Sequence, residues 1–141
     1  MGVGIMPNSS EAMAALAGKA AHVKTIVNDG NTAKAVGSGD LDVFATPMMI
    51  ALMERAACVC LSDCMEKGQT SVGTHIEVSH TAASPLGAEI TATATIQSVI
   101  GGRIEFMVTA SDAAGEIGRG KHARVVVDEQ RFSAGVMKRK E

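Results

Sequence analysis

Glu54 lies in the middle of a segment, residues 43–61, that is otherwise almost entirely apolar and is typical of a helix buried on every side. Its neighbours three and four positions away on such a helix carry no opposite charge; they are Ile50, Ala51, Ala57 and Cys58. A carboxylate is costly to bury without a partner, so Glu54 must pair with another element or take up a proton. Either outcome makes Glu54 a candidate for acid–base or nucleophilic chemistry.

His80 is the second candidate, at the end of a segment with the alternation of a β-strand. The period of two places His80 on one face with Thr74, Ile76 and Val78, whereas His75 falls on the opposite, polar face. A histidine that faces the core would face the apolar helix and its carboxylate. We therefore expect the imidazole of His80 to pair with that carboxylate, an arrangement that suits proton transfer.

Thr46 is the third candidate, because it precedes Pro47 where the apolar helix should begin. Thr is a good N-cap and Pro is favoured at the first helical position. The free N–H groups of a helix N-terminus also suit an oxyanion or a carboxylate. The eight positions from Thr46 to Glu54 span about 12 Å, too far for contact within one chain. A site that uses both is then composite between two subunits, or is bridged by substrate.

The elements that must position these residues follow from turn signals and periodicity. The sequence predicts a short helix over residues 10–17, strand pieces over 22–27 and 32–36, one long helix over 46–65, and strands over 69–82, 89–100, 103–112 and 116–128. In the strands predicted over 89–100 and 103–112, alternating apolar residues indicate one face packed on a core. One apolar helix with an antiparallel meander is an α+β arrangement, and a sheet wrapped around such a helix is the hot-dog fold. Such sheets usually extend across a dimer.

Composition narrows the class of protein. The 141 residues suit one domain, divided into a flexible N-terminal arm (1–20), a hot-dog domain (21–132) and an exposed basic tail (133–141). A formal net charge of −2 and only three aromatic residues, all Phe, argue against nucleic acid and anionic membranes as partners. With no leader or transmembrane run visible, we expect a cytoplasmic protein.

The remaining chemistry-bearing residues form no recognised motif. Cys58, Cys60 and Cys64 have neither a disulfide framework nor the spacing of a zinc knuckle, so reduced thiols are expected. The histidines and cysteines show no metal-ligand spacing, and no Gly-rich motif opens a helix. We expect neither a metal nor a cofactor.

Two further polar residues have open interpretations. Arg124 is either a surface charge or a cation near a CoA phosphate or a carboxylate. His122 either lines the site or faces water.

The motifs together resemble one family. They are Val43-Phe44-Ala45-Thr46, Leu52-Met53-Glu54, Gly73-Thr74, Val78-Ser79-His80-Thr81-Ala82-Ala83, and Glu116-Ile117-Gly118 with His122 and Arg124. Over residues 43–132 the chain resembles the fluoroacetyl-CoA thioesterase family of hot-dog proteins. The resemblance implies a catalytic set of Thr46, Glu54 and His80. It also implies a glycine near the thioester carbonyl at Gly73 and a positioning arginine at Arg124.

The resemblance implies hydrolysis of a short acyl-CoA thioester by a homodimer, and whether two dimers associate is left open. Glu54 would attack the carbonyl or act as base on water, His80 would shuttle the proton, and Thr46 would hold Glu54 or substrate. Residues 37–42 contain no aromatic side chain, unlike the stretch before the family's catalytic Thr, so fluoroacetyl selectivity does not follow. The alternatives are an enoyl-CoA hydratase-like activity and a non-catalytic module that binds acyl-CoA or another small ligand.

Overall fold

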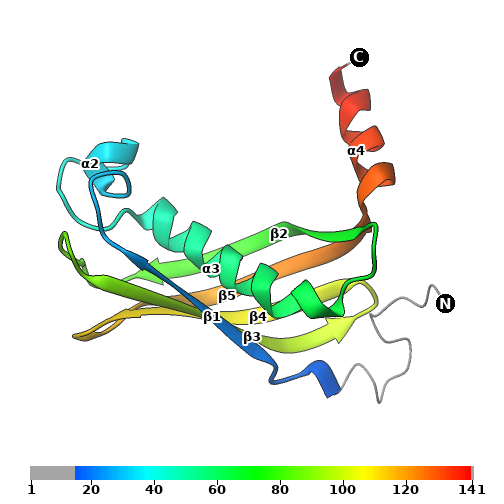
Figure 1. Ribbon diagram of the computed structural model, residues 1–141, viewed down its shortest axis with the longest axis horizontal. Coiled ribbons are helices and arrows are strands. Elements are labelled where there is room, and N and C mark those ends of the chain that lie inside the picture. The colour runs from blue at the N-terminus through cyan, green and yellow to red at the C-terminus, as the bar shows by residue number, and fades with distance from the viewer. Residues whose placement is uncertain (1–14, 141) are drawn as a thin grey trace.

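The computed structural model describes residues 15–140, which form one antiparallel sheet crossed by one long helix (Figure 1). The strands are β1 (Ala20–Ile26), β2 (Gln69–His80), β3 (Glu89–Ile100), β4 (Arg103–Asp112) and β5 (Gly115–Asp128). Their order in the sheet is β1-β3-β4-β5-β2, so β1 and β2 are the two edges. The predicted α+β class and the four strands after the helix are confirmed, but these strands do not form one meander: β3, β4 and β5 are consecutive neighbours, whereas β2 pairs with β5 rather than with β3. Of the helix predicted over 10–17, residues 10–14 lie outside the described residues, as does most of the predicted arm, and residues 15 and 16 are helical.

Helix α3 (Thr46–Leu61) supplies the centre of the core and packs mainly against β1 and β3. Its buried positions are Met49, Met53, Ala56, Ala57, Cys60 and Leu61. The sheet packs against α3 with alternating buried residues, as the sequence predicts. They are Ile90, Ala92, Ala94 and Ile96 on β3, and Ile104, Phe106, Val108 and Ala110 on β4. Burial of these side chains is the main stabilising contribution to the fold.

Two β-bulges break the alternation that the sequence predicts. On β3 the register shifts between Ile96 and Ser98, so Val99 is buried and Ile100 is 72% exposed, opposite to the predicted pattern. On β2 the register shifts between Gly73 and His75 and leaves Thr74 as the extra residue. Beyond this bulge the predicted parity of β2 is confirmed, because Ile76, Val78 and His80 lie opposite inward positions of β5.

Two predictions about the segment before and within α3 are wrong. Residues 32–36 do not form a strand: Thr32 caps a four-residue helix, α2 (Ala33–Val36), by accepting a hydrogen bond from the Ala35 N–H. Helix α3 is not buried on every side either. Arg55, Cys58 and Val59 are exposed, and together with their neighbours they leave one face of α3 uncovered within this chain.

The chain ends in a second exposed helix, α4 (Glu129–Met137), followed by one turn at Lys138–Lys140. Figure 1 shows α4 standing away from the sheet beyond the end of β5, at the opposite end of α3 from α2. Residues 133–140 of the predicted tail are therefore helical and exposed. Among the described residues, no helix has the length and apolar character needed to cross a bilayer.

Candidate functional site

Thr46 and His80 meet where the start of α3 approaches the end of β2. Thr46 Oγ1 lies 2.7 Å from His80 Nδ1, a hydrogen-bond distance. The predicted role of Thr46 as N-cap is wrong, because α3 begins at Thr46 itself and the N-cap position is Ala45. Since its hydroxyl does not cap the helix, Thr46 is able to bond the imidazole instead.

A small cavity opens beside this pair. It has a volume of about 260 Å³ and is lined by Thr46, His80 and a set of small or apolar residues: Ala33, Ser38, Val43, Phe44, Thr81, Ala82 and Ala83. The Nε2 atom of His80 is buried and has no hydrogen-bond partner among the described residues. A polar atom without a partner beside a cavity is typical of a site that a ligand completes.

Burial lowers the pKa of His80 below its usual value, opposed in part by the backbone of Ala82. Desolvation disfavours the imidazolium form, so His80 is neutral at pH 7. A neutral imidazole at hydrogen-bond distance from a hydroxyl is able to accept its proton.

Glu54 lies elsewhere, and the predicted Glu54–His80 pair does not form within one chain. The Glu54 side chain is 42% exposed rather than buried, and its Oε2 atom is 3.7 Å from Nη1 of Arg124 on β5. The expectation that this carboxylate finds a partner on another element is thus confirmed, with a guanidinium in place of the imidazole. Of the two interpretations of Arg124, the carboxylate partner is the correct one, since Arg124 is only 7% exposed.

Arg124 is fixed by bonds to β2. Its Nε donates to Ser71 Oγ at 2.8 Å and its Nη2 donates to the Ser71 carbonyl at 3.0 Å. Its Nη1 lies 3.2 Å from Nε2 of His122, which is 2% exposed. His122 therefore does not face water; it lies beside Arg124 and lines the cavity next to Glu54. The sequence analysis missed Ser71, and no motif in the chain pointed to it.

Gly73 completes this second cluster at the bulge of β2. A Cβ atom at Gly73 would lie 2.9 Å from Glu54 Oε2, 3.2 Å from His122 Cε1 and 3.4 Å from Arg124 Nη1. Only a glycine leaves room for the three side chains at these distances. A cavity of about 200 Å³ at this point is lined by Glu54, Gly73, His122 and Thr74–Ile76.

The five residues predicted for the site thus form two clusters in one chain. Thr46 contacts His80, while Glu54 lies with Arg124 and Gly73. The eight positions between Thr46 and Glu54 on α3 separate the clusters by about 12 Å.

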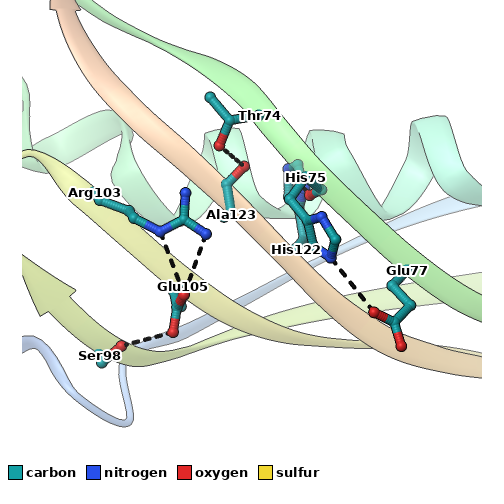
Figure 2. Close-up of polar contacts among 8 residues, drawn as sticks. All are labelled: Thr74, His75, Glu77, Ser98, Arg103, Glu105, His122 and Ala123. Carbon is teal, nitrogen blue, oxygen red and sulfur yellow. Dashed lines mark hydrogen bonds and ion pairs between the residues drawn. The ribbon is translucent and has the colours of Figure 1, made fainter.

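A larger cavity lies on the other face of the sheet and includes neither cluster as a whole. Its volume is about 450 Å³, and Figure 2 shows the charged side chains beside it. Arg103 donates to Glu105, and His75 Nε2 lies 3.5 Å from Glu77 Oε1 (Figure 2), so these side chains already contact one another. Within residues 15–140, no group of His, Cys, Asp and Glu side chains is arranged to hold a metal ion.

Comparisons with known proteins agree with the fold and the motifs. The sequence model of the fluoroacetyl-CoA-specific thioesterase family matches residues 27–130. The fluoroacetyl-CoA thioesterase of Streptantibioticus cattleyicolor is 44% identical over 95 residues, which are 67% of this chain and 68% of that protein.

Two solved structures show the same architecture. A mutant of the fluoroacetyl-CoA-specific thioesterase FlK, in complex with fluoroacetate and CoA, has a TM-score of 0.78 and 35% identity over 82% of this chain and 98% of that chain. A hot-dog-like protein from Thermanaerovibrio acidaminovorans has a TM-score of 0.80 and 27% identity over 87% and 91% of the two chains. The predicted hot-dog fold is confirmed, and the chain belongs to the fluoroacetyl-CoA-specific thioesterase family of acyl-CoA thioesterases.

Proposed function

We propose that the chain hydrolyses short acyl-CoA thioesters to the acid and free CoA, with Thr46, Glu54 and His80 as the catalytic set. The observation that carries the proposal is the contact of Thr46 Oγ1 with His80 Nδ1 beside a small open cavity. A hydroxyl bonded to a neutral imidazole, next to a cavity with a free imidazole nitrogen, suits acyl transfer.

The separation of the two clusters supports a site shared between two subunits. Glu54 is about 12 Å along α3 from Thr46, so it cannot reach a thioester carbonyl held by His80 of its own chain unless substrate bridges the gap. The β2 edge is paired only with β5 among the described strands, and an open edge of twelve residues is a surface for a second copy. A two-fold axis beside this edge would bring the Glu54 cluster of one protomer toward the Thr46 cluster of its partner.

In this arrangement each group has one task. Glu54 supplies the attacking oxygen, either its own or that of a water it deprotonates, and Arg124 holds its carboxylate in place. His80, neutral and oriented by Thr46, takes up a proton from the attacking or solvent water and passes it to the departing thiolate of CoA, so that it returns to the neutral form. The N–H of Gly73 bonds the developing oxyanion.

The acyl group that we propose is short and need not be fluorinated. The curated relative and FlK are named for fluoroacetyl-CoA. In this chain the cavity beside Thr46 is lined mostly by small side chains, and no aromatic residue is present in residues 37–42. Phe44 supplies the one phenyl ring in the described lining of this cavity, so the pocket has few aromatic contacts that could distinguish fluoroacetyl from acetyl, propionyl or butyryl groups.

A thiol-release assay over short acyl-CoA esters tests the activity. We expect turnover by the wild-type chain and a loss of at least about 100-fold in kcat for Glu54→Gln, which keeps the side-chain shape, with little change in the thermal midpoint. Hydration of an enoyl-CoA without thiol release would indicate the hydratase instead. Tight binding of acyl-CoA by calorimetry, without release of thiol or hydration, would indicate the binding module.

Mixing two inactive variants tests the shared site. In a dimer of Thr46→Ala with Glu54→Gln, one composite site carries both substitutions and the other carries neither. Random reassociation of equal amounts makes half of the dimers mixed, so about one quarter of the wild-type activity should return. A site within one chain predicts no recovery, because every chain carries one substitution.

A further inference from the structure

His122 is held between β2 and Arg124 by two bonds that fix its protonation state. Its Nδ1 lies 2.7 Å from the carbonyl oxygen of His75, and its Nε2 lies 3.2 Å from Arg124 Nη1. A carbonyl only accepts, so Nδ1 must carry the proton. A guanidinium only donates, so Nε2 must present its lone pair. Both bonds are satisfied only by the neutral imidazole with hydrogen on Nδ1.

This imidazole completes the immobilisation of Arg124. The Nε and Nη2 donors of the guanidinium already bond Ser71 on one side. His122 adds an acceptor on the Nη1 side, which is also the side that faces Glu54 at 3.7 Å. Without that acceptor, Nη1 would face Glu54 and the buried interior with no hydrogen-bond partner among these residues, and only the Ser71 bonds on the opposite side would hold the guanidinium.

We propose that His122 is a positioning residue that acts through Arg124 to set the place of the Glu54 carboxylate, and that it does so only as the neutral Nδ1–H imidazole. The proposal rests on the function proposed above, in which Glu54 reacts. A second proton on Nε2 would remove the acceptor and place a positive charge against the guanidinium. Turnover should therefore be lost when His122 is protonated.

The surroundings of His122 favour the neutral form at pH 7. Burial lowers the pKa of His122, and the charges of Arg124 on β5 and His75 on β2 lower it further. The His75 carbonyl and the carboxylate of Glu54 on α3 raise it in part. From β4, the ring of Phe106 stacks at a centroid distance of 6.1 Å and adds no charge.

Two substitutions separate the two bonds of His122. His122→Asn places an amide near the Nδ1 position, so it can still donate to the His75 carbonyl but cannot reach Arg124. His122→Gln reaches the Nε2 position and can still accept from Arg124. We expect kcat to fall at least about tenfold in His122→Asn with little change in KM, and to stay within about threefold of wild type in His122→Gln. Lys121→Gln, at an exposed position on the other face of β5, is the matched control and should match wild type.

The pH profile of kcat/KM distinguishes a positioning role of His122 from a merely structural one, which would leave the profile unchanged. With both His80 and His122 required neutral, log kcat/KM should fall on the acid side with a limiting slope of two. In His122→Gln the slope should become one, since only His80 then titrates. Equal losses in the Asn and Gln variants, or an unchanged slope, would overturn the positioning role.

Nitrogen chemical shifts of the imidazole provide a test that does not depend on activity. In the wild-type protein labelled with ¹⁵N-histidine, His122 should show a protonated Nδ1 and a bare Nε2 at pH 7. An Nε2–H tautomer would overturn the proposal even if thioester hydrolysis is observed. If the wild-type chain hydrolyses no thioester, the function proposed for Glu54 fails, and the catalytic role of His122 fails with it. The measured tautomer would still show whether His122 donates to the His75 carbonyl and accepts from Arg124.

Discussion

Gly73→Ala should separate activity from stability, because its new methyl group would point into the Glu54 cluster. The Cβ would lie 2.9 Å from Glu54 Oε2, whereas ordinary van der Waals contact begins at 3.4 Å. The carboxylate would therefore have to move by about 0.5 Å. A displacement of about 1 Å at a reacting group can cost about 100-fold in rate, so half of that predicts a loss of about tenfold in kcat.

The same substitution should leave the fold intact. The atom that must move most is the end of the flexible, half-exposed Glu54 side chain. The His122 ring, whose Cε1 would lie 3.2 Å from the new Cβ, has to give by only a few tenths of an ångström, so no backbone atom has to shift. Gly73 does not have a positive φ, and replacing a strand glycine by alanine removes about 0.5–1 kcal/mol of unfavourable entropy. The thermal midpoint should be equal to that of wild type or slightly higher.

The assay compares kcat from thiol release with the thermal midpoint from circular dichroism. Gly102→Ala is the matched control, since its Cβ would meet only the Val126 carbonyl at an ordinary 3.6 Å. It should leave both quantities unchanged. If Gly73→Ala kept the kcat of wild type, the position of the Glu54 carboxylate near Gly73 would not matter for turnover. The proposed catalytic role of this carboxylate would then be wrong.

Two further predictions concern stability. Gly120→Ala should lower the free energy of unfolding by about 3 kcal/mol in a urea titration. The new Cβ would overlap the Glu77 carbonyl and crowd Val78, both on the paired strand β2. A urea midpoint equal to that of wild type would contradict the close packing of β2 on β5. The urea midpoint should also fall between pH 7.5 and 5.5, because burial lowers the pKa of both His80 and His122 below the value near 6.5 of an unfolded chain. The unfolded state then binds more protons than the folded state, so stability is lost as the pH falls, and a midpoint constant over this range would argue against neutral buried histidines.

Much of the sheet could be predicted because its strands are local patterns. The bounds of β3 and β4 follow from alternation and from the turns at Gly87 and Gly101, both of which have positive φ. The segment over 32–36, predicted as a strand, is the helix α2, and its four residues are too few to show a helical period. In the structure Thr32 acts instead through its hydroxyl as a cap, and Gly37 closes the helix in the left-handed conformation.

The candidate site was harder, because its pairs join elements far apart in sequence. Periodicity correctly turned His80 inward, but it could not say which end of α3 the imidazole would meet. The first residue of α3 determines the contact. Because α3 begins at Thr46 rather than after it, the Thr46 hydroxyl does not cap the helix and bonds His80. On β5 a usable signal was present, since Gly118 and Gly120 alternate on one face with His122 and Arg124. Polar side chains on the core face of a strand indicate a site.

The bulge of β2 explains how one strand serves both clusters. With His80 inward, strict alternation would place Thr74 opposite Arg124 and turn Ser71 to the outer face. The extra residue shifts the register, so that Gly73 lies opposite Arg124 and Ser71 bonds the guanidinium, while His80 still faces Thr46. The side chain of Thr74 at the place of Gly73 would overlap the Glu54 carboxylate even more than the methyl of alanine. A single inserted residue therefore supplies three conditions at once: room for Glu54, a fixed Arg124 and an inward His80.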